Sequence, residues 1–335
     1  MDFLSADSLP WLSDSQRRMR ASRIAKRLPQ ALLILSVPGL GAEQLAYWIA
    51  ALVLCESQDA PPCGACPACV LLRADTHPDL HAVRLAEDAQ QVKVDQIRAL
   101  TETLSLSSYR GGHKVAIVEN AETLNTNGAN AFLKTLEEPT ADTLLMLIAK
   151  PSHRLPATIA SRCQRLNLRA PAKEEAAAWL KERDPQVLDW NAALALAAGA
   201  PLLALELQPA ATPELDREMR TTLKRLVDGA CDVTAVADAW MKSDPALRLL
   251  WLENWITRRV QVQLGGAVPS QSAEPVRLPA ALLKPKIRPL FELLDAAREL
   301  RGFAATGLNQ QLALEALLLG GRAALFKALR EVEAK

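Results

Sequence analysis

Three short runs of consecutive apolar residues constrain the fold of this chain more than any other feature. They cover residues 31–37, 114–118 and 143–149. Such a run is typical of a strand buried on both faces, as in a parallel sheet covered by helices. Apolar residues recur at helical spacing after the first run, and a helical stretch at 129–136 stops before Pro139. Strands that alternate with helices predict an α/β domain with a parallel sheet.

The pattern changes after residue 169 and becomes helical. We expect helices at 172–183 and 192–207, then helix nearly throughout 214–335, interrupted by a Gly, Pro and Ser-rich loop at 265–279. No internal repeat of fixed period is present. The expected organisation is an α/β domain (1–169), a small helical domain (170–208) and a C-terminal helical domain (209–335).

Charge and aromatic content exclude some classes of nucleic-acid-binding protein. Lys and Arg number 39 against 38 Asp and Glu, so any such contact has to come from a local patch. Aromatic residues make up 4% of the chain, too few for a platform that stacks bases. The basic stretch 17–27 is a candidate for phosphate contact, but a solvated helix face is the favoured interpretation. Trp240, Trp251 and Trp255 are expected in a helical core.

We expect no segment to cross a membrane. The longest apolar tract, 192–207, is interrupted by Gly199, Pro201 and Glu206, whereas a spanning helix needs about 20 apolar residues. The chain starts with Met-Asp and lacks the basic start and apolar core of a secretory signal. These features predict a cytoplasmic protein.

Four cysteines, Cys55, Cys63, Cys66 and Cys69, lie within 15 residues. Thiolates suit tetrahedral zinc, and four of them leave no open position for catalysis, so the favoured interpretation is one structural zinc ion. An iron–sulfur cluster is an alternative, but no fourth cysteine follows the third of the Cys-x2-Cys-x2-Cys run as a ferredoxin needs. Free structural thiols are another. His77 is a possible substitute ligand, although the favoured interpretation is that it belongs to the turn at 76–79 and does not bind the metal.

The loop after the first apolar run resembles a phosphate-binding loop that lacks the lysine and the hydroxyl residue of the motif. A Walker A loop has Gly-x4-Gly-Lys-Ser/Thr between a strand and a helix. Here the loop contains Gly39 and Gly41, but Ala42 stands at the lysine position and Glu43 at the hydroxyl position. A carboxylate there repels phosphate. A chance Gly-x-Gly turn is the alternative interpretation.

The second apolar strand run ends in a similarly altered pair. A hydrolytic site of this architecture needs Asp-Glu there, to hold Mg²⁺ and align water. This chain has Glu119 and Asn120, and an amide cannot accept the proton. A simple strand-end turn remains the alternative for these two residues.

The residues together resemble the AAA+ clamp-loader family of bacterial replication. The resemblance is carried by the cysteine cluster, the Thr-His-Pro-Asp turn at 76–79, the string Ala131–Pro139 (AFLKTLEEP) and the string Ser161-Arg162-Cys163. Their order and spacing cover about residues 30–170, and a weaker helical pattern extends the match. The resemblance implies an AAA+-like fold in which the small helical domain is a lid and the C-terminal helices form a collar.

The resemblance implies that this chain lacks the residues with which the family's motor subunits bind and hydrolyse ATP. The family's sensor-1 position falls on Ala149 and its sensor-2 arginine position on Leu202. Because the lysine, the hydroxyl, the base and both sensors are altered together, no productive ATP binding and no intrinsic ATPase activity are expected. Enzyme status therefore rests on membership of the DNA polymerase III complex, not on chemistry within this chain.

The resemblance also implies that Arg162 is a trans arginine finger that contacts the γ-phosphate of ATP on a neighbouring subunit. A strand-capping surface arginine is the alternative, and Arg165 is a second candidate finger. Cys163 is expected to be a buried thiol. The implied partners are the ATPase (gamma and tau) subunits, the delta subunit and, through the complex, the sliding clamp and primed DNA. An active ATPase motor and a redox protein are the rival functions.

Overall fold

The computed structural model describes residues 8–57, 60–86, 89, 91–150, 155–187, 189–207, 212–263, 288–302 and 309–333. The chain divides into two compact units, the first ending at Pro171 and the second beginning at Ala172. The finer boundary expected between 208 and 209 remains a prediction. The loop expected at 265–279 lies outside the described residues.

The first unit is built on a five-stranded parallel sheet, in the order β2-β3-β4-β1-β5. The strands are β1 (Ala31–Leu35), β2 (Leu80–Val83), β3 (Lys114–Val118), β4 (Thr143–Ala149) and β5 (Gln164–Asn167). Every residue of β1, β3 and β4 is buried. The predicted parallel sheet is confirmed, and its central strands are the three apolar runs.

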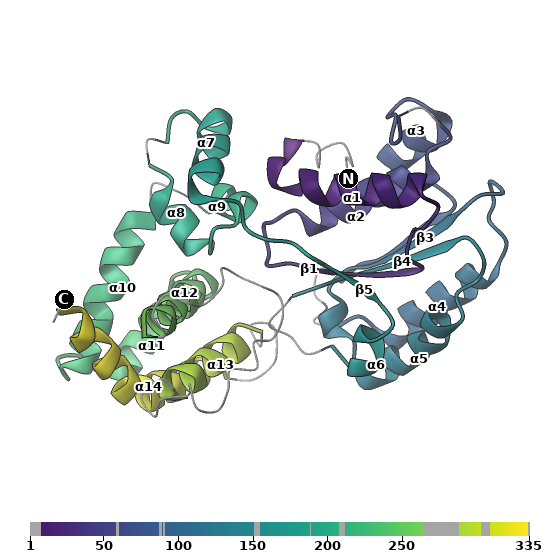
Figure 1. The fold of residues 1–335 in the computed structure, drawn as a ribbon. Coiled ribbons are helices and arrows are strands. Elements are labelled where there is room, and N and C mark those ends of the chain that lie inside the picture. Colours follow the sequence, from purple (N-terminus) through teal and green to yellow (C-terminus); the bar gives the residue numbers. More distant parts are fainter. Residues whose placement is uncertain are drawn as a thin grey trace. The chain divides into compact units, whose positions relative to one another are not determined.

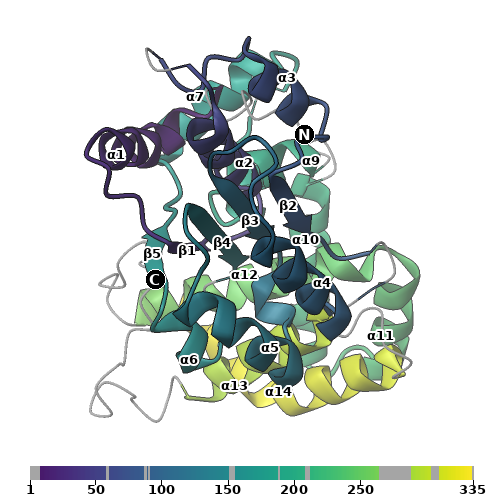
Figure 2. The same cartoon turned by 90° about the vertical axis from the view of Figure 1, so that its right-hand side faces the viewer.

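Helices cover both faces of this sheet (Figures 1 and 2). One face carries α1 (Ser13–Ile24), α2 (Ala42–Leu54) and α3 (Pro67–Arg73); the other carries α4 (Val94–Ser105), α5 (Thr126–Glu137) and α6 (Ala157–Ala160). The described residues of the unit also form two short 3-10 helices, η2 (Pro10–Leu12) and η3 (Ala121–Thr123). The helix expected at 129–136 is α5. It begins after Asn125, whose side chain accepts a hydrogen bond from the Gly128 N–H at 2.8 Å.

The described part of the second unit is all helical. It contains α7 (Lys173–Arg183), α8 (Asn191–Leu196), α9 (Pro201–Glu206), α10 (Thr212–Val227), α11 (Val233–Lys242), α12 (Pro245–Gln263), α13 (Arg288–Gly302) and α14 (Gln310–Glu333). Trp240, Trp251 and Trp255 lie in its hydrophobic core, as expected. Across the described residues, no helix has the length and apolar character that a bilayer crossing requires.

The single helix expected at 192–207 is wrong, because the structure has two short helices there. Ala198 and Gly199 adopt left-handed conformations, with φ of 53° and 83°. A right-handed helix cannot pass through two such residues. Pro201 then starts α9 at a position where its missing N–H costs nothing.

Candidate functional site

The loop between β1 and α2 turns at two glycines with positive φ. Gly39 and Gly41 have φ of 82° and 85°, a region that glycine enters without steric cost. A Cβ atom at Gly41 would lie 2.7 Å from the Leu9 Cδ1 atom. The Trp11 indole N–H also donates to the Leu40 carbonyl at 2.9 Å. The segment before α1 therefore packs directly onto this loop.

A cavity of about 220 Å³ lies beside the loop, at the carboxyl ends of β1, β3 and β4. The structure brings together Ala42, Glu43, Asn120 and Ala149 in its lining, although the sequence separates them widely. Open α/β sheets bind ligands at this edge. Leu202, the fifth altered position, lies in α9 of the second unit.

Among the lining residues that the structure describes there is one lysine, and it is already paired. Lys150 follows β4, and its Nζ lies 3.4 Å from Oε1 of Glu122, whose side chain is 2% exposed. The cavity thus holds one paired cation together with the carboxylates of Glu43 and Glu122. An anionic triphosphate meets no free positive charge among these lining residues.

Glu119 takes part in an internal network. Its Oε1 accepts hydrogen bonds from the Tyr47 hydroxyl and the Arg84 Nε–H, both at 3.3 Å. Arg84 also donates to Tyr47 and pairs with Asp75 at 3.0 Å. Burial raises the pKa of Glu119, against the opposing effect of Arg84, and raises the pKa of Tyr47 to about 12. Tyr47 and Arg84 belong to no local motif with Glu119, so the sequence analysis missed them.

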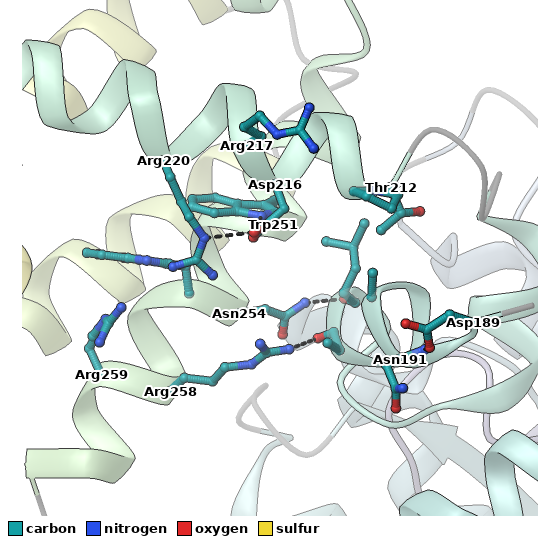
Figure 3. Close-up of a pocket in the computed structure, with 15 residues that line it drawn as sticks. Asp189, Asn191, Thr212, Asp216, Arg217, Arg220, Trp251, Asn254, Arg258 and Arg259 are labelled. Atoms are coloured by element: carbon teal, nitrogen blue, oxygen red, sulfur yellow. Dashed lines mark hydrogen bonds and ion pairs between the residues drawn. The ribbon is translucent and has the colours of Figure 1, made fainter. Parts of the chain in front are cut away.

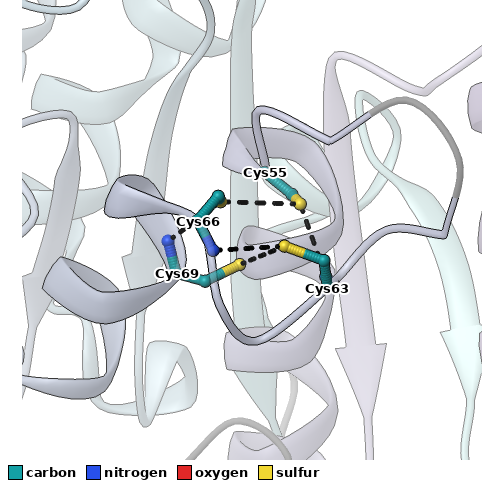
Figure 4. Close-up of side chains that lie close together, drawn as sticks. All are labelled: Cys55, Cys63, Cys66 and Cys69. Atoms are coloured by element: carbon teal, nitrogen blue, oxygen red, sulfur yellow. Dashed lines mark hydrogen bonds between the residues drawn. The ribbon is translucent and has the colours of Figure 1, made fainter.

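The four clustered cysteines converge as expected (Figure 4). Their Sγ atoms all lie within 4.8 Å of one another; the Cys55–Cys66 pair is 3.9 Å apart and the Cys63–Cys69 pair 4.0 Å. Tetrahedral zinc with Zn–S bonds of about 2.3 Å places its sulfurs about 3.8 Å apart. The donor set and its spacing therefore fit a four-thiolate metal site.

Backbone N–H groups point at the sulfurs of this cluster. Cys63 N donates to Cys55 Sγ, Cys66 N to Cys63 Sγ and Cys69 N to Cys66 Sγ, at 3.3–3.4 Å. Hydrogen bonds from the Ala65 and Cys66 N–H groups lower the pKa of Cys63 to about 6. These donors favour the thiolate form at Cys63, whereas burial raises the pKa of Cys55 and of Cys69.

His77 lies in the turn, as favoured from the sequence. Its Nδ1 accepts a hydrogen bond from the Asp79 N–H at 3.1 Å. The Asp79 carboxylate in turn accepts from the backbone N–H groups of Tyr109 and Arg110. These bonds fix the chain where it enters β2, and the group of possible metal ligands consists of the four cysteines without His77.

Arg162 lies between α6 and β5, and its guanidinium is held by two acceptors. Its Nη2 contacts Oε1 of Glu137, at the end of α5, at 2.5 Å. Its Nη1 donates to the Thr158 carbonyl at 2.8 Å. The side chain is 35% exposed. Neighbouring Cys163 is buried, which raises the pKa of its thiol to about 11, so it is a poor nucleophile.

The basic stretch 17–27 falls mainly on α1, and several of its arginines have partners within the unit. Arg17 and Arg18 both pair with Asp14. Arg20 lies over the Trp48 ring, and Arg23 donates to the Cys55 carbonyl at 3.2 Å. This pattern agrees with a helix face that is partly solvated and partly packed.

The matching family model and similar known proteins point to the same family. A family model described as "DNA polymerase III, delta subunit" matches residues 13–172. The chain is 34% identical to the DNA polymerase III subunit delta' of Pseudomonas aeruginosa, over 77% of this chain and 79% of that protein. It is 33% identical to the Escherichia coli subunit delta', over 92% and 94%.

A solved DNA polymerase III gamma subunit-related protein of Thermotoga maritima aligns with a TM-score of 0.38 at 17% identity, over 94% of this chain and 99% of that chain. That likeness is too loose to carry an argument. The sheet, the altered phosphate loop and the sequence relatives define an AAA+-like protein of the clamp-loader class. Within that class, the chain belongs to the DNA polymerase III subunit delta' family.

Proposed function

We propose that this chain is a non-hydrolysing subunit of a cytoplasmic clamp loader, which loads the sliding clamp onto primed DNA. The cavity beside the altered phosphate loop carries this proposal. Its lining offers two carboxylates and a lysine that is already paired. The acid at the end of β3 is bound to Tyr47 and Arg84. In the described part of the chain, a site arranged in this way lacks a free cation for the phosphates and the base of phosphoryl transfer.

Arg162 is the group through which the chain acts on catalysis. The ATP would be held by a neighbouring gamma or tau subunit, and the delta subunit would complete the ring. A guanidinium is always charged and can contact two phosphate oxygens at once as charge develops. Glu137 and the Thr158 carbonyl orient the Arg162 side chain, while its partial exposure leaves it accessible. Arginine fingers raise the rate about 10³–10⁵-fold.

The test is reconstitution of the ring with wild-type chain, Arg162→Ala or Arg162→Lys, followed by clamp-stimulated ATPase and clamp-loading assays. We expect Arg162→Ala to enter the ring normally and to lower both rates, because one ATP site loses its trans cation. Arg162→Lys should restore little, since an ammonium cannot reproduce the planar fork. Arg169→Ala is the matched control, an exposed arginine seven residues away with no proposed role. Normal rates for an assembled Arg162→Ala ring would refute the finger.

The four cysteines are proposed to hold one structural zinc ion. All four coordination positions are filled by thiolates, so the ion would fold the segment between α2 and β2 and would take no part in catalysis. Elemental analysis of chain purified without chelator should find about one zinc per chain. Iron with sulfide, or a chain that retains no metal, would contradict this assignment.

A further inference from the structure

A second cavity, of about 780 Å³, lies in the second unit beside α8, α10 and α12 (Figure 3). None of the functions proposed above uses it. Four arginines line it: Arg217 and Arg220 from α10, and Arg258 and Arg259 from α12. Its volume falls within the usual range for small-molecule sites, about 300–1,000 Å³.

Two aspartates are the only carboxylates among the lining residues, and both have partners. Asp216 accepts hydrogen bonds from Arg220 at 2.7 Å and from the Trp251 indole at 2.9 Å. Asp189 accepts from the Asn191 N–H at 2.8 Å, at the start of α8. Asp216 therefore balances Arg220, and no carboxylate of the lining pairs with the other three guanidinium groups.

Two of these three guanidinium groups face neutral partners. Arg258 reaches from α12 to the Ala195 carbonyl of α8, and Asn254 reaches to the Leu196 carbonyl. Arg259 lies over the Trp255 ring, 5.1 Å from its centroid. Arg217 is exposed and makes no ion pair with the described residues. The cavity thus has an excess of positive charge.

The two arginines of α12 lie close to other positively charged guanidinium groups. Burial and then Arg220 lower the pKa of Arg258, against the raising effect of Asp216. Burial, Arg220 and Arg258 lower the pKa of Arg259. Like charges at short distance disfavour the charged form. An anion in the cavity would remove this repulsion.

We propose that this cavity binds a compact polyphosphate anion, held by Arg217, Arg258 and Arg259. Arginine forks match phosphate oxygens bidentately, and several guanidinium groups in one small cavity suit a ligand with several charges on few atoms. The faces of both lining tryptophans already lie near arginines, so the anion and not a base is the recognised part. The ligand would connect α8 with α10 and α12, the helices on either side of the predicted lid and collar boundary.

Calorimetry on the full-length, zinc-loaded chain at low salt tests this proposal with three probes: inorganic tripolyphosphate, ATP without Mg²⁺, and adenosine. We expect saturable binding of tripolyphosphate and ATP, none of adenosine, and weaker binding as salt rises. Comparable affinities would indicate that inorganic polyphosphate suffices. ATP binding that is about 10-fold or more tighter would indicate a nucleoside polyphosphate.

The variant that tests the location is Arg217→Ala/Arg259→Ala. Its affinity for tripolyphosphate should fall at least about 10-fold, because two charge-assisted contacts are lost. Arg225→Ala is the matched control: it is an exposed arginine of α10 that does not line the cavity, and it should bind as wild type does.

Three results would overturn the proposal. One is the absence of saturable tripolyphosphate and ATP binding at millimolar concentration. Another is equal binding by wild-type chain and Arg217→Ala/Arg259→Ala, which would place the anion elsewhere in the molecule. The third is saturable binding of a poly-glutamate peptide where neither phosphate probe binds, which would make the cavity a docking site for an acidic protein segment.

Discussion

At the scale of single residues, Glu119 and Arg162 differ in how firmly their charged groups are held by neighbouring side chains. The Glu119 carboxylate is bound inside the unit by Tyr47 and Arg84. Arg162 makes an ion pair whose partners are 35% and 49% exposed, and exposed pairs contribute at most about 1 kcal/mol. The Arg162–Glu137 pair can therefore open when a stronger anion arrives, whereas the Glu119 network is not free to serve another ligand.

Glu137→Gln tests whether Glu137 positions Arg162. The amide keeps the size of the side chain but removes its charge, so chain stability should change by no more than about 1 kcal/mol. ATPase of the reconstituted ring should fall less than with Arg162→Ala, and Glu137→Asp should recover part of it. The control is Glu138→Gln, at an exposed neighbouring carboxylate. Wild-type rates for Glu137→Gln would show that Arg162 needs no support from Glu137.

Ala42→Lys tests whether the absence of the loop lysine is enough by itself to prevent ATP hydrolysis. The new lysine enters a cavity that still lacks a base, since Asn120 cannot accept a proton, and Glu43 still repels phosphate. We expect no ATP turnover by the isolated chain, measured by phosphate release, even if calorimetry detects some nucleotide binding. Measurable turnover in this variant would show that the missing lysine alone had silenced the site.

At the scale of elements, the sequence predicted the strands that are buried on both faces and missed those at the edges. All of β3 and β4, and the whole of β1, lie in apolar runs. Strands β2 and β5 are four residues long and carry polar side chains such as His81 and Arg165. An edge strand of this length has no apolar run or clear alternation, so only its pairing with β3 or β1 defines it.

Three glycines allow a graded test of backbone strain: Gly41 before α2, and Gly111 and Gly112 between α4 and β3. Gly112→Ala should change stability little, because the new Cβ meets nothing within 4 Å and φ is not left-handed. Gly111→Ala should cost about 1–2 kcal/mol, because φ is +69° in open space. Gly41→Ala combines φ of +85° with a Cβ placed 2.7 Å from Leu9, and should cost more than Gly111→Ala. Urea unfolding gives the order, and an equal cost for both left-handed sites would mean that Leu9 moves aside freely.

At the scale of the whole molecule, sequence reasoning predicted the parts of the sites that are local. The cysteine cluster, the loop at 39–43 and the Ser161-Arg162-Cys163 string are each contiguous or nearly so. The network of Tyr47, Arg84 and Glu119 and the arginine-lined cavity of the second unit join residues far apart in the chain. Only the folded sheet and the packed helices bring these groups together, so no spacing in the sequence indicates them.

The two units have separate hydrophobic cores, and this predicts two steps in unfolding. The cysteine cluster belongs to the first unit, so a chelator should lower the midpoint of one thermal transition and leave the other unchanged. Cys63→Ser should lower the same transition without chelator. Cys231→Ser, at a cysteine of the second unit outside the cluster, should not affect it. A single transition that moves as a whole would mean that the units unfold together.

The network of Tyr47, Arg84 and Glu119 also bears on what it would take for this chain to hydrolyse ATP. Restoring hydrolysis would require Glu119 to release Arg84 and Tyr47 and turn towards a metal, which would leave a buried hydroxyl without its acceptor and a guanidinium with one partner fewer. Each such step costs folding stability before any turnover is gained. Under the proposed function, a variant of this chain would therefore have to give up these contacts before it could gain ATPase activity.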